Sequence, residues 1–181
     1  AYHCFCTADR LEAMRKEREL QKLSPKYDRH CLGLTPQEIA SRVAAGEPHV
    51  LRMRVPDGDT VRFSDIVRGE VEFSTEQIDD QVLLKSDGYP TYHLANVVDD
   101  HLMGISHVIR GEDHVSNTGT QIEIFEALGA TPPLFAHHNL LTGADGEGLS
   151  KRLGSLSIGE LREAGLEPMS VAIAATLNGT S

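Results

Sequence analysis

Two cysteines near the amino terminus and a third farther along form the first group of residues that could do chemistry. Cys4 and Cys6 are separated by one residue, and Cys31 follows within the segment YDRHC. A Cys-x-Cys pair on an extended segment can bring both thiolates to one cation, and a distant third ligand suits a site with tetrahedral geometry. Three reduced thiols without a metal are the alternative that this spacing leaves open. The side chains near enough in sequence to supply a fourth ligand are those of His3, Tyr27 and His30.

The second group lies in an acidic part of the sequence. Residues 86–150 carry nine acidic residues, and Arg110 is their only permanent cation. On a helix, Tyr92 and Asn96 lie one turn apart on the same face, and Arg110 ends the strand expected to follow. Ligands bind at the carboxyl ends of strands in parallel sheets, where a guanidinium suits bidentate capture of a carboxylate or phosphate. The alternative is an internal ion pair of Arg110 with Asp99, Glu112 or Asp113.

The third group is the loop GADGEGLSKR at residues 143–152, in which three glycines lead into Ser150, Lys151 and Arg152. Glycines permit close approach of the backbone, and a hydroxyl with two cations suits a phosphate. The loop does not match the phosphate-loop spacing G-x-x-x-x-G-K-[ST]. A solvated surface turn explains it almost as well, so spacing alone leaves its role open.

Two regions of different pattern must position these side chains. Up to residue 85 the sequence predicts a small mixed α and β module, and from Ser86 helices and strands alternate, which indicates part of a parallel α/β sheet. Two strands cannot form such a sheet alone, so further strands come either from residues 50–85 or from sequence outside this chain. The expected helices are residues 7–24, 35–46, 91–103, 115–128, 157–165 and 167–178, and the expected strands are residues 50–55, 61–67, 69–74, 82–85, 106–111 and 134–141.

The charge of the chain is acidic overall but unevenly distributed. A formal net charge of -10 argues against general nucleic-acid binding. Residues 1–31, however, hold seven of the 17 lysines and arginines against five acidic residues, and a solvated amphipathic helix is the simplest interpretation. No stretch approaches the roughly 18 apolar residues of a membrane span, and no signal-peptide pattern is present. We therefore expect a cytoplasmic protein without a membrane partner.

Two stretches carry a family resemblance. The run DGYPTYHLANVVDDHLMGISHVIRGEDHVSNT, followed by LLTGADGEGLSKR, closely resembles bacterial glutamyl-tRNA synthetases, which are class I aminoacyl-tRNA synthetases. The resemblance covers essentially the whole chain. It implies the second half of a Rossmann-like nucleotide-binding fold, with an inserted α+β domain for the tRNA acceptor end and the start of a helical connecting domain. It also implies activation of glutamate by ATP and Mg²⁺, followed by transfer of the glutamyl group to the 3′ end of tRNA.

The resemblance assigns roles to residues of the acidic part. Tyr92, Asn96 and Arg110 match positions that line the glutamate pocket, with the arginine on the carboxylate of the substrate. Asp113 and His114 match positions beside the ATP site.

The glycine-rich loop matches the second class I signature, usually Lys-Met-Ser-Lys-Ser, which clamps the phosphates of ATP. The resemblance therefore implies catalytic roles for Ser150, Lys151 and Arg152, and contacts to ATP from Leu141 and Lys151.

Residues 1–85 resemble the insertion with which this family grips the acceptor end of tRNA. Some relatives bind zinc there through Cys-x-Cys and a later Tyr-x-x-x-Cys, so the resemblance implies Cys4, Cys6, Tyr27 and Cys31 as ligands. Contacts to tRNA phosphates provide affinity that does not depend on base sequence. The residues expected to make them are Arg10, Arg15, Lys16, Arg18 and Lys22.

The expected organisation is an insertion at residues 1–85, the second half of the catalytic domain at 86–145, and the signature loop with the start of a helical region at 146–181. No His-x-Gly-His motif occurs in the sequence. We therefore expect an internal fragment, without the first signature and the anticodon-binding domain, that is inactive alone and derives from a monomeric enzyme. The alternatives are a noncatalytic zinc-stabilised module that binds tRNA or a protein, and a relative that charges glutamine tRNA or a queuosine base.

Overall fold

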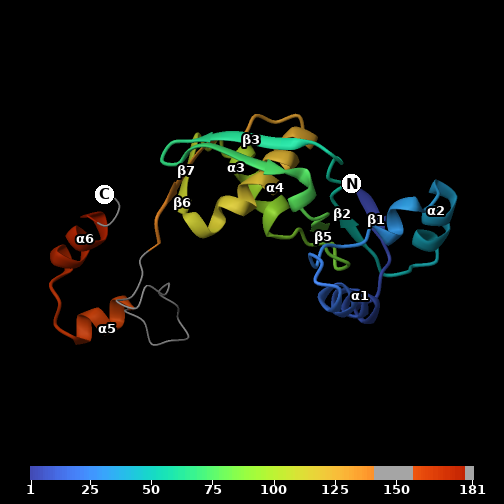
Figure 1. The fold of residues 1–181 in the computed structure, drawn as a ribbon, viewed down its shortest axis with the longest axis horizontal. Helices are drawn as coiled ribbons and strands as arrows, with labels where there is room; N and C mark the ends of the chain where they lie inside the picture. The colour runs from blue at the N-terminus through green and yellow to red at the C-terminus, as the bar shows by residue number, and fades with distance from the viewer. Residues whose placement is uncertain (141–156, 178–181) are drawn as a thin grey trace.

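The computed structural model describes residues 1–140 and 157–177, and the strands in these ranges form two sheets (Figure 1). The smaller sheet is antiparallel and has the order β1-β2-β5. Its strands are Tyr2–Cys4 (β1), Val50–Arg52 (β2) and Val82–Leu84 (β5). The sequence pattern predicted β2 and β5 but not β1, because three residues are too few to show an alternation of apolar and polar side chains.

The larger sheet has the order β4-β3-β7-β6. β3 and β4 form an antiparallel hairpin, whereas β3, β7 and β6 run parallel. The two strands expected in the α/β part are thus completed by strands from residues 50–85. Because β6 and β7 align Arg110 with His137, the carboxyl ends of these two strands lie side by side. The strands are Thr60–Asp65 (β3), Gly69–Ser74 (β4), His107–Gly111 (β6) and Leu134–His138 (β7).

Three of the helices begin after a residue whose side chain caps them, namely Thr7, Thr35 and Ser157. Thr35 precedes α2 and forms a capping box with Glu38, in which each side chain accepts a hydrogen bond from the backbone N–H of the other residue. The α-helices are Ala8–Leu20 (α1), Pro36–Ala44 (α2), Tyr92–Leu102 (α3), Val115–Ala127 (α4), Ile158–Glu163 (α5) and Pro168–Leu177 (α6), and the 3-10 helices are His30–Gly33 (η1), Thr75–Gln77 (η2) and Glu112–His114 (η3). Among the described residues, no helix has the length and apolar character to span a membrane.

The arrangement of the helices follows the two sheets. In Figure 1, α3 and α4 lie together beside the β3–β4 hairpin, while α1 and α2 lie at the end of the molecule that holds the smaller sheet. The main apolar core packs Val55 and Val61 against Val97, Phe125 and Phe135, so apolar packing is continuous across residue 85. The domain boundary at that residue stays a prediction. A second, smaller cluster consists of Tyr2, Cys4, Met14, Tyr27 and Cys31.

Candidate functional site

Arg110 lies at the carboxyl end of β6, partly buried, and its guanidinium is held by three neighbouring side chains. Nε donates to Nε2 of His137 at 3.1 Å, and Nη2 donates to Oγ1 of Thr118 at 2.6 Å and to Oε1 of Gln121 at 2.8 Å. None of these bonds uses Nη1. The protein therefore fixes the plane of the guanidinium mainly through one edge, and Tyr92 is a further hydrogen-bonding neighbour of the group.

His137 is fully buried in β7 and links Arg110 to a buried carboxylate. Because the guanidinium only donates, Nε2 of His137 must accept, and the proton of the neutral ring lies on Nδ1. Nδ1 then donates to Oδ2 of Asp65 at 2.6 Å. Asp65 also accepts from the backbone N–H groups of Val67 and Arg68 at 3.0 Å each, so its carboxylate is well supplied with donors although it is 2% exposed.

Gln121 connects Arg110 to Asn96 on the neighbouring helix. Its Oε1 accepts from Arg110, and its Nε2 donates to Oδ1 of Asn96 at 2.8 Å. We call these five residues, Asp65, His137, Arg110, Gln121 and Asn96, the Arg110 network. The sequence predicted Asn96 and Arg110 at one site, and the structure joins them through Gln121.

The internal ion pair that the sequence left open for Arg110 is absent from the described residues. The carboxylate of Glu112 pairs instead with Arg68, and Asp113 lies 3.8 Å from Nε2 of His114. Burial lowers the pKa of Arg110 below its usual range, while Tyr92 and the nearby acids act in the opposite direction. A partly buried guanidinium without a carboxylate partner is a site that favours an anion.

Tyr92, His93 and His114 surround the same end of β6. Tyr92 is 51% exposed, and its ring centroid lies 5.3 Å from that of His93 and 6.3 Å from that of His114. Nδ2 of Asn117 lies 3.0 Å from Nδ1 of His114, which holds the imidazole in place. Burial, followed by the charges of Arg110 and His114, lowers the pKa of His93. The polar groups at this end of the sheet therefore form one cluster around Arg110.

Asp65 gives the Arg110 network a measurable pH dependence. Burial alone would raise its pKa above the usual 3.8, but hydrogen bonds from His137 and from backbone N–H groups outweigh burial and lower it. A carboxyl with a lowered pKa stabilises the fold above its unfolded pKa, and this stabilisation is lost as the pH falls through the lower folded value.

We expect Asp65→Asn to reduce the free energy of unfolding at neutral pH by about 2 to 3 kcal/mol, because a charged hydrogen-bond acceptor is lost from a buried site. Urea denaturation at about pH 7, 5 and 3 measures this. The difference from wild type should be constant at the two higher values and shrink at the lowest. Asp99→Asn, at an exposed position of α3, is the matched control. A difference that is equally large at the lowest pH would contradict the assignment.

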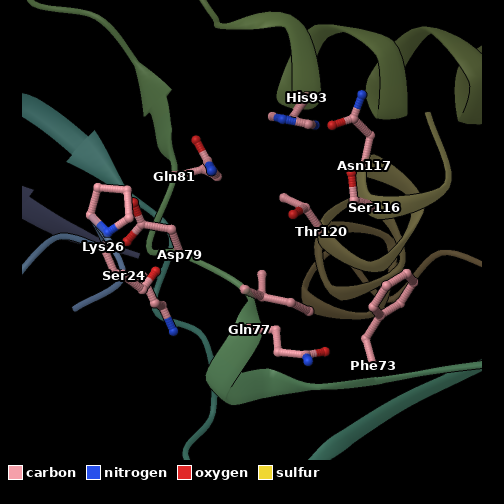
Figure 2. Close-up of a pocket in the computed structure, with 12 residues that line it drawn as sticks. Ser24, Lys26, Phe73, Gln77, Asp79, Gln81, His93, Ser116, Asn117 and Thr120 are labelled. Atoms are coloured by element: carbon pink, nitrogen blue, oxygen red, sulfur yellow. The ribbon is translucent and has the colours of Figure 1, made fainter. Parts of the chain in front are cut away.

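A separate cavity of about 540 Å³ lies next to this cluster (Figure 2). His93, Ser116, Asn117 and Thr120 line it from α3 and α4, and Figure 2 shows Lys26, Asp79 and Gln81 on the opposite side. Tyr92, Asn96 and Arg110 do not line this cavity. Sequence spacing could not have found it, because the lining residues come from five separate stretches of the chain.

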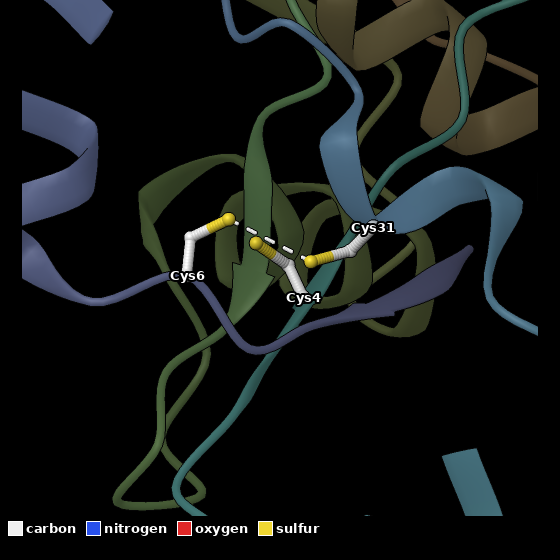
Figure 3. Close-up of side chains that lie close together, drawn as sticks. All are labelled: Cys4, Cys6 and Cys31. Carbon is white, nitrogen blue, oxygen red and sulfur yellow. Dashed lines mark hydrogen bonds between the residues drawn. The ribbon is translucent and has the colours of Figure 1, made fainter. Parts of the chain in front are cut away.

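The three cysteines lie together, as the spacing suggested (Figure 3). Their sulfur atoms are within 4.8 Å of one another, and those of Cys6 and Cys31 are 3.6 Å apart. The hydroxyl of Tyr27 lies 3.3 Å from the sulfur atoms of both Cys4 and Cys6. With zinc–sulfur bonds of about 2.3 Å, tetrahedral ligands are separated by roughly 3.5 to 4 Å. The 3.6 Å between Cys6 and Cys31 and the two contacts of the Tyr27 hydroxyl are near this range, so these residues could hold a metal ion.

The charges around the cysteines also fit a metal. Burial raises the pKa of Cys6 to about 11 and raises that of Tyr27 well above its usual range. For Cys4 burial acts in the same direction, but hydrogen bonds with Tyr27, the backbone of Cys6 and Arg52 together outweigh it and lower the pKa. A bound cation would favour the ionised form of every ligand. A complex of Zn²⁺ with three thiolates has a net negative charge. The guanidinium of Arg52, which is 6% exposed and lies 4.1 Å from the ring centroid of Tyr27, would offset this charge.

The basic residues of the amino-terminal region differ in their availability. Arg10 and Lys16 already form ion pairs of 2.6 Å with Asp28 and Glu12. Arg18 donates to the backbone oxygen of Ser24. Arg15 and Lys22 are exposed. Of the five residues expected to contact tRNA, these two are the better placed to bind an external phosphate.

The remaining residues predicted from the sequence are Leu141, Ser150, Lys151 and Arg152, and they lie outside the described residues. Conversely, sequence reasoning missed Asp65, Gln121, His137 and Thr118. Asp65 and His137 are 72 positions apart in the sequence, so no local spacing signals their contact.

The fold and the site define an α/β protein with a partly buried arginine at the carboxyl ends of parallel strands, the edge at which α/β domains bind their ligands. Residues 1–181 match a protein-family model that is described as the catalytic domain of class I tRNA synthetases (E and Q). The chain belongs to this family. Its fold is accordingly that of a class I synthetase.

Relatives of known name agree with this assignment. The chain is 50% identical over 169 residues to a glutamate–tRNA ligase of Treponema pallidum, covering 93% of this chain and 32% of that protein. It is 50% identical over 189 residues to glutamate–tRNA ligase 1 of Brucella ovis, covering 99% of this chain and 41% of that protein. The chain thus spans about a third to two fifths of the length of these relatives.

Solved structures resemble it as well. A crystal structure of a glutamate tRNA ligase from Elizabethkingia meningosepticum, in complex with its amino acid, has a TM-score of 0.77 and 36% sequence identity, covering 84% of this chain and 32% of that one. A glutamate–tRNA synthetase from Elizabethkingia anophelis has a TM-score of 0.77 and 32% identity, covering 91% of this chain and 34% of that one.

Proposed function

We propose that the protein to which this sequence belongs is a glutamate–tRNA ligase. The carboxylate of glutamate attacks the α-phosphate of ATP and displaces pyrophosphate, and the glutamyl group then passes from the adenylate to the 3′ end of tRNA with release of AMP. Family membership and the names of the relatives support this class of reaction. The observation that carries the choice of substrate is Arg110, a partly buried guanidinium held through one edge without a carboxylate partner among the described residues.

Arg110, Asn96 and Tyr92 are proposed to bind glutamate. Arg110 contacts a carboxylate of the substrate, with the charge of the guanidinium already partly desolvated by the protein. A charge-assisted hydrogen bond in such surroundings is about twice as strong as a neutral one. Nε and Nη2 already donate hydrogen bonds within the protein, so the ligand meets Nη1 and the adjacent donors. The bidentate contact that the sequence suggested can therefore use only part of the guanidinium.

ATP is proposed to bind beside this pocket, near Asp113 and His114. Catalysis of adenylate formation depends mainly on positioning the two substrates and on stabilising the charge of the phosphates. Mg²⁺ enters with ATP as part of the substrate and offsets part of this charge. The remaining residues proposed for this role are Leu141, Ser150, Lys151 and Arg152, from the signature loop.

Residues 1–85 are proposed to bind the acceptor end of tRNA. Arg15 and Lys22 would contact phosphates, since neither has an acidic partner within the described part of the chain. A zinc ion held by Cys4, Cys6, Cys31 and Tyr27 would tie β1 to the segment before η1. The role of this metal is structural, because all four coordination positions are filled by the protein.

Aminoacylation assays on a full-length ligase carrying this sequence test the proposal. The expected result is ATP-dependent attachment of glutamate, but not glutamine, to glutamate tRNA. Charging of glutamine tRNA or of a queuosine base would identify one of the other relatives. Binding of tRNA with no transfer of any amino acid would overturn the enzymatic assignment in favour of a noncatalytic module.

A further inference from the structure

The hydrogen bonds around Gln121 have only one consistent direction. Arginine only donates, so Gln121 must present Oε1 to Nη2 of Arg110, 2.8 Å away. The other amide atom of Gln121 is Nε2, which can only donate, so Asn96 must present Oδ1 to it, also at 2.8 Å. Gln121 is 1% exposed, so water does not reach its amide to replace either hydrogen-bond partner. The orientation of the Asn96 amide is therefore determined by Arg110 through Gln121.

This orientation decides which atom of Asn96 remains for a ligand. Oδ1 is engaged by Gln121, so Nδ2 is the amide atom left over. Nδ2, Nη1 of Arg110 and the hydroxyl of Tyr92 can all donate a hydrogen bond to a ligand. A carboxylate accepts from several donors, whereas a carboxamide would turn its own N–H groups toward at least one of them. A donor that finds no acceptor in a desolvated site costs binding free energy. These three donors therefore favour a carboxylate over a carboxamide.

We propose that Gln121 is a specificity-determining residue, which makes the pocket select the side-chain carboxylate of glutamate over the carboxamide of glutamine. It acts through Asn96 and Arg110 and does not itself need to touch the substrate. The inference rests on the proposed function, since it presupposes that Arg110 and Asn96 bind the amino acid.

Gln121→Glu is the informative substitution. A glutamate side chain accepts at both oxygens, so it can still bind Arg110, but Asn96 must then turn to donate Nδ2 toward residue 121. Oδ1 of Asn96 would face the ligand in place of a donor, and the new carboxylate would neutralise Arg110. Both changes weaken binding of a carboxylate, and the reversed amide provides an acceptor for a carboxamide.

The experiment measures the dissociation constants of glutamate and glutamine by calorimetry, on a full-length ligase that carries this sequence. For Gln121→Glu we expect glutamate affinity to fall about tenfold or more, and the ratio of glutamate to glutamine affinity to fall at least as far. Gln121→Met, which releases Asn96 but keeps the charge of Arg110 unpaired, should lower this ratio less. Gln37→Glu makes the same chemical change at an exposed position of α2 and should leave both constants unchanged.

The outcomes separate the two proposals. If the wild-type ligase binds neither amino acid, the proposed function fails, and this inference fails with it. If wild type selects glutamate but Gln121→Glu keeps the same ratio, the inference alone is overturned. Equal losses for both amino acids in Gln121→Glu and Gln121→Met would show a merely structural role and would also overturn it. Should Gln121→Glu not fold, as judged by its thermal unfolding, the ratio in Gln121→Met decides in the same way.

Discussion

Replacing Arg110 by glutamine is expected to weaken glutamate binding by about thirtyfold to a few thousandfold, because truncating a desolvated charged partner costs about 2 to 5 kcal/mol. Glutamine keeps a polar side chain but removes the positive charge, and its shorter reach cannot maintain contacts to His137, Thr118 and Gln121 together. The affinity for ATP should change little by comparison. The measurement is the dissociation constant of glutamate, together with the rate of glutamate-dependent pyrophosphate exchange in the presence of tRNA.

Arg110→Lys separates charge from geometry. An ammonium group keeps the charge but cannot replace a planar guanidinium with three fixed contacts. We expect glutamate binding between that of wild type and that of Arg110→Gln. Arg62→Gln, which removes an exposed arginine paired with Glu72 on the β3–β4 hairpin, is the control and should bind glutamate normally. A glutamine variant that retains wild-type affinity for glutamate would rule out Arg110 as the carboxylate ligand.

Local patterns in the sequence predicted most of the helices and strands, because each has a signal within a few residues. Thr35 and Glu38 predict the start of α2 by their spacing, and the turn residues PDGD at 56–59 predict the start of β3. β1 gave no such signal. The sequence also left the missing strands of the parallel sheet undecided, since pairing of β3 with β7 joins segments about 70 residues apart.

Some residues of the site could likewise be predicted from local sequence patterns, whereas others could not. Tyr92 and Asn96 share a helix face, and Arg110 follows on the next strand, so these three could be grouped from the sequence. The residues that orient Arg110 could not, because Asp65 lies in the hairpin while Gln121 and His137 lie on later elements. Their polar side chains have no unusual sequence context. Only the fold shows that each hydrogen bond in the network has its direction fixed by a neighbour.

The cysteine cluster gives the second large expected effect. We expect about one zinc ion per chain, and we expect Cys31→Ser to abolish it. The apolar cluster around the cysteines is small, with five buried members, Tyr2, Cys4, Met14, Tyr27 and Cys31, and a few partly buried neighbours such as Leu32 and Val50. In small zinc-binding domains the metal contributes folding free energy directly. Loss of a few kcal/mol in a protein of this size corresponds to a fall of about 5 to 10 °C in the midpoint of thermal unfolding.

The fourth ligand can be identified by a matched set of variants. Tyr27→Phe removes only the hydroxyl that lies 3.3 Å from Cys4 and Cys6, and it should weaken zinc binding about tenfold or more while preserving the buried ring. His30 is exposed, and the ring of His3 lies 5.1 Å from that of His49, so His30→Ala and His3→Ala should leave the metal content unchanged. Metal analysis and competition with a chromophoric chelator measure both effects. Zinc well below one equivalent in the wild type would refute the site altogether. Loss of zinc in a histidine variant, with Tyr27→Phe unaffected, would instead place a histidine in the fourth position and show that the phenol of Tyr27 only hydrogen-bonds to the thiolates.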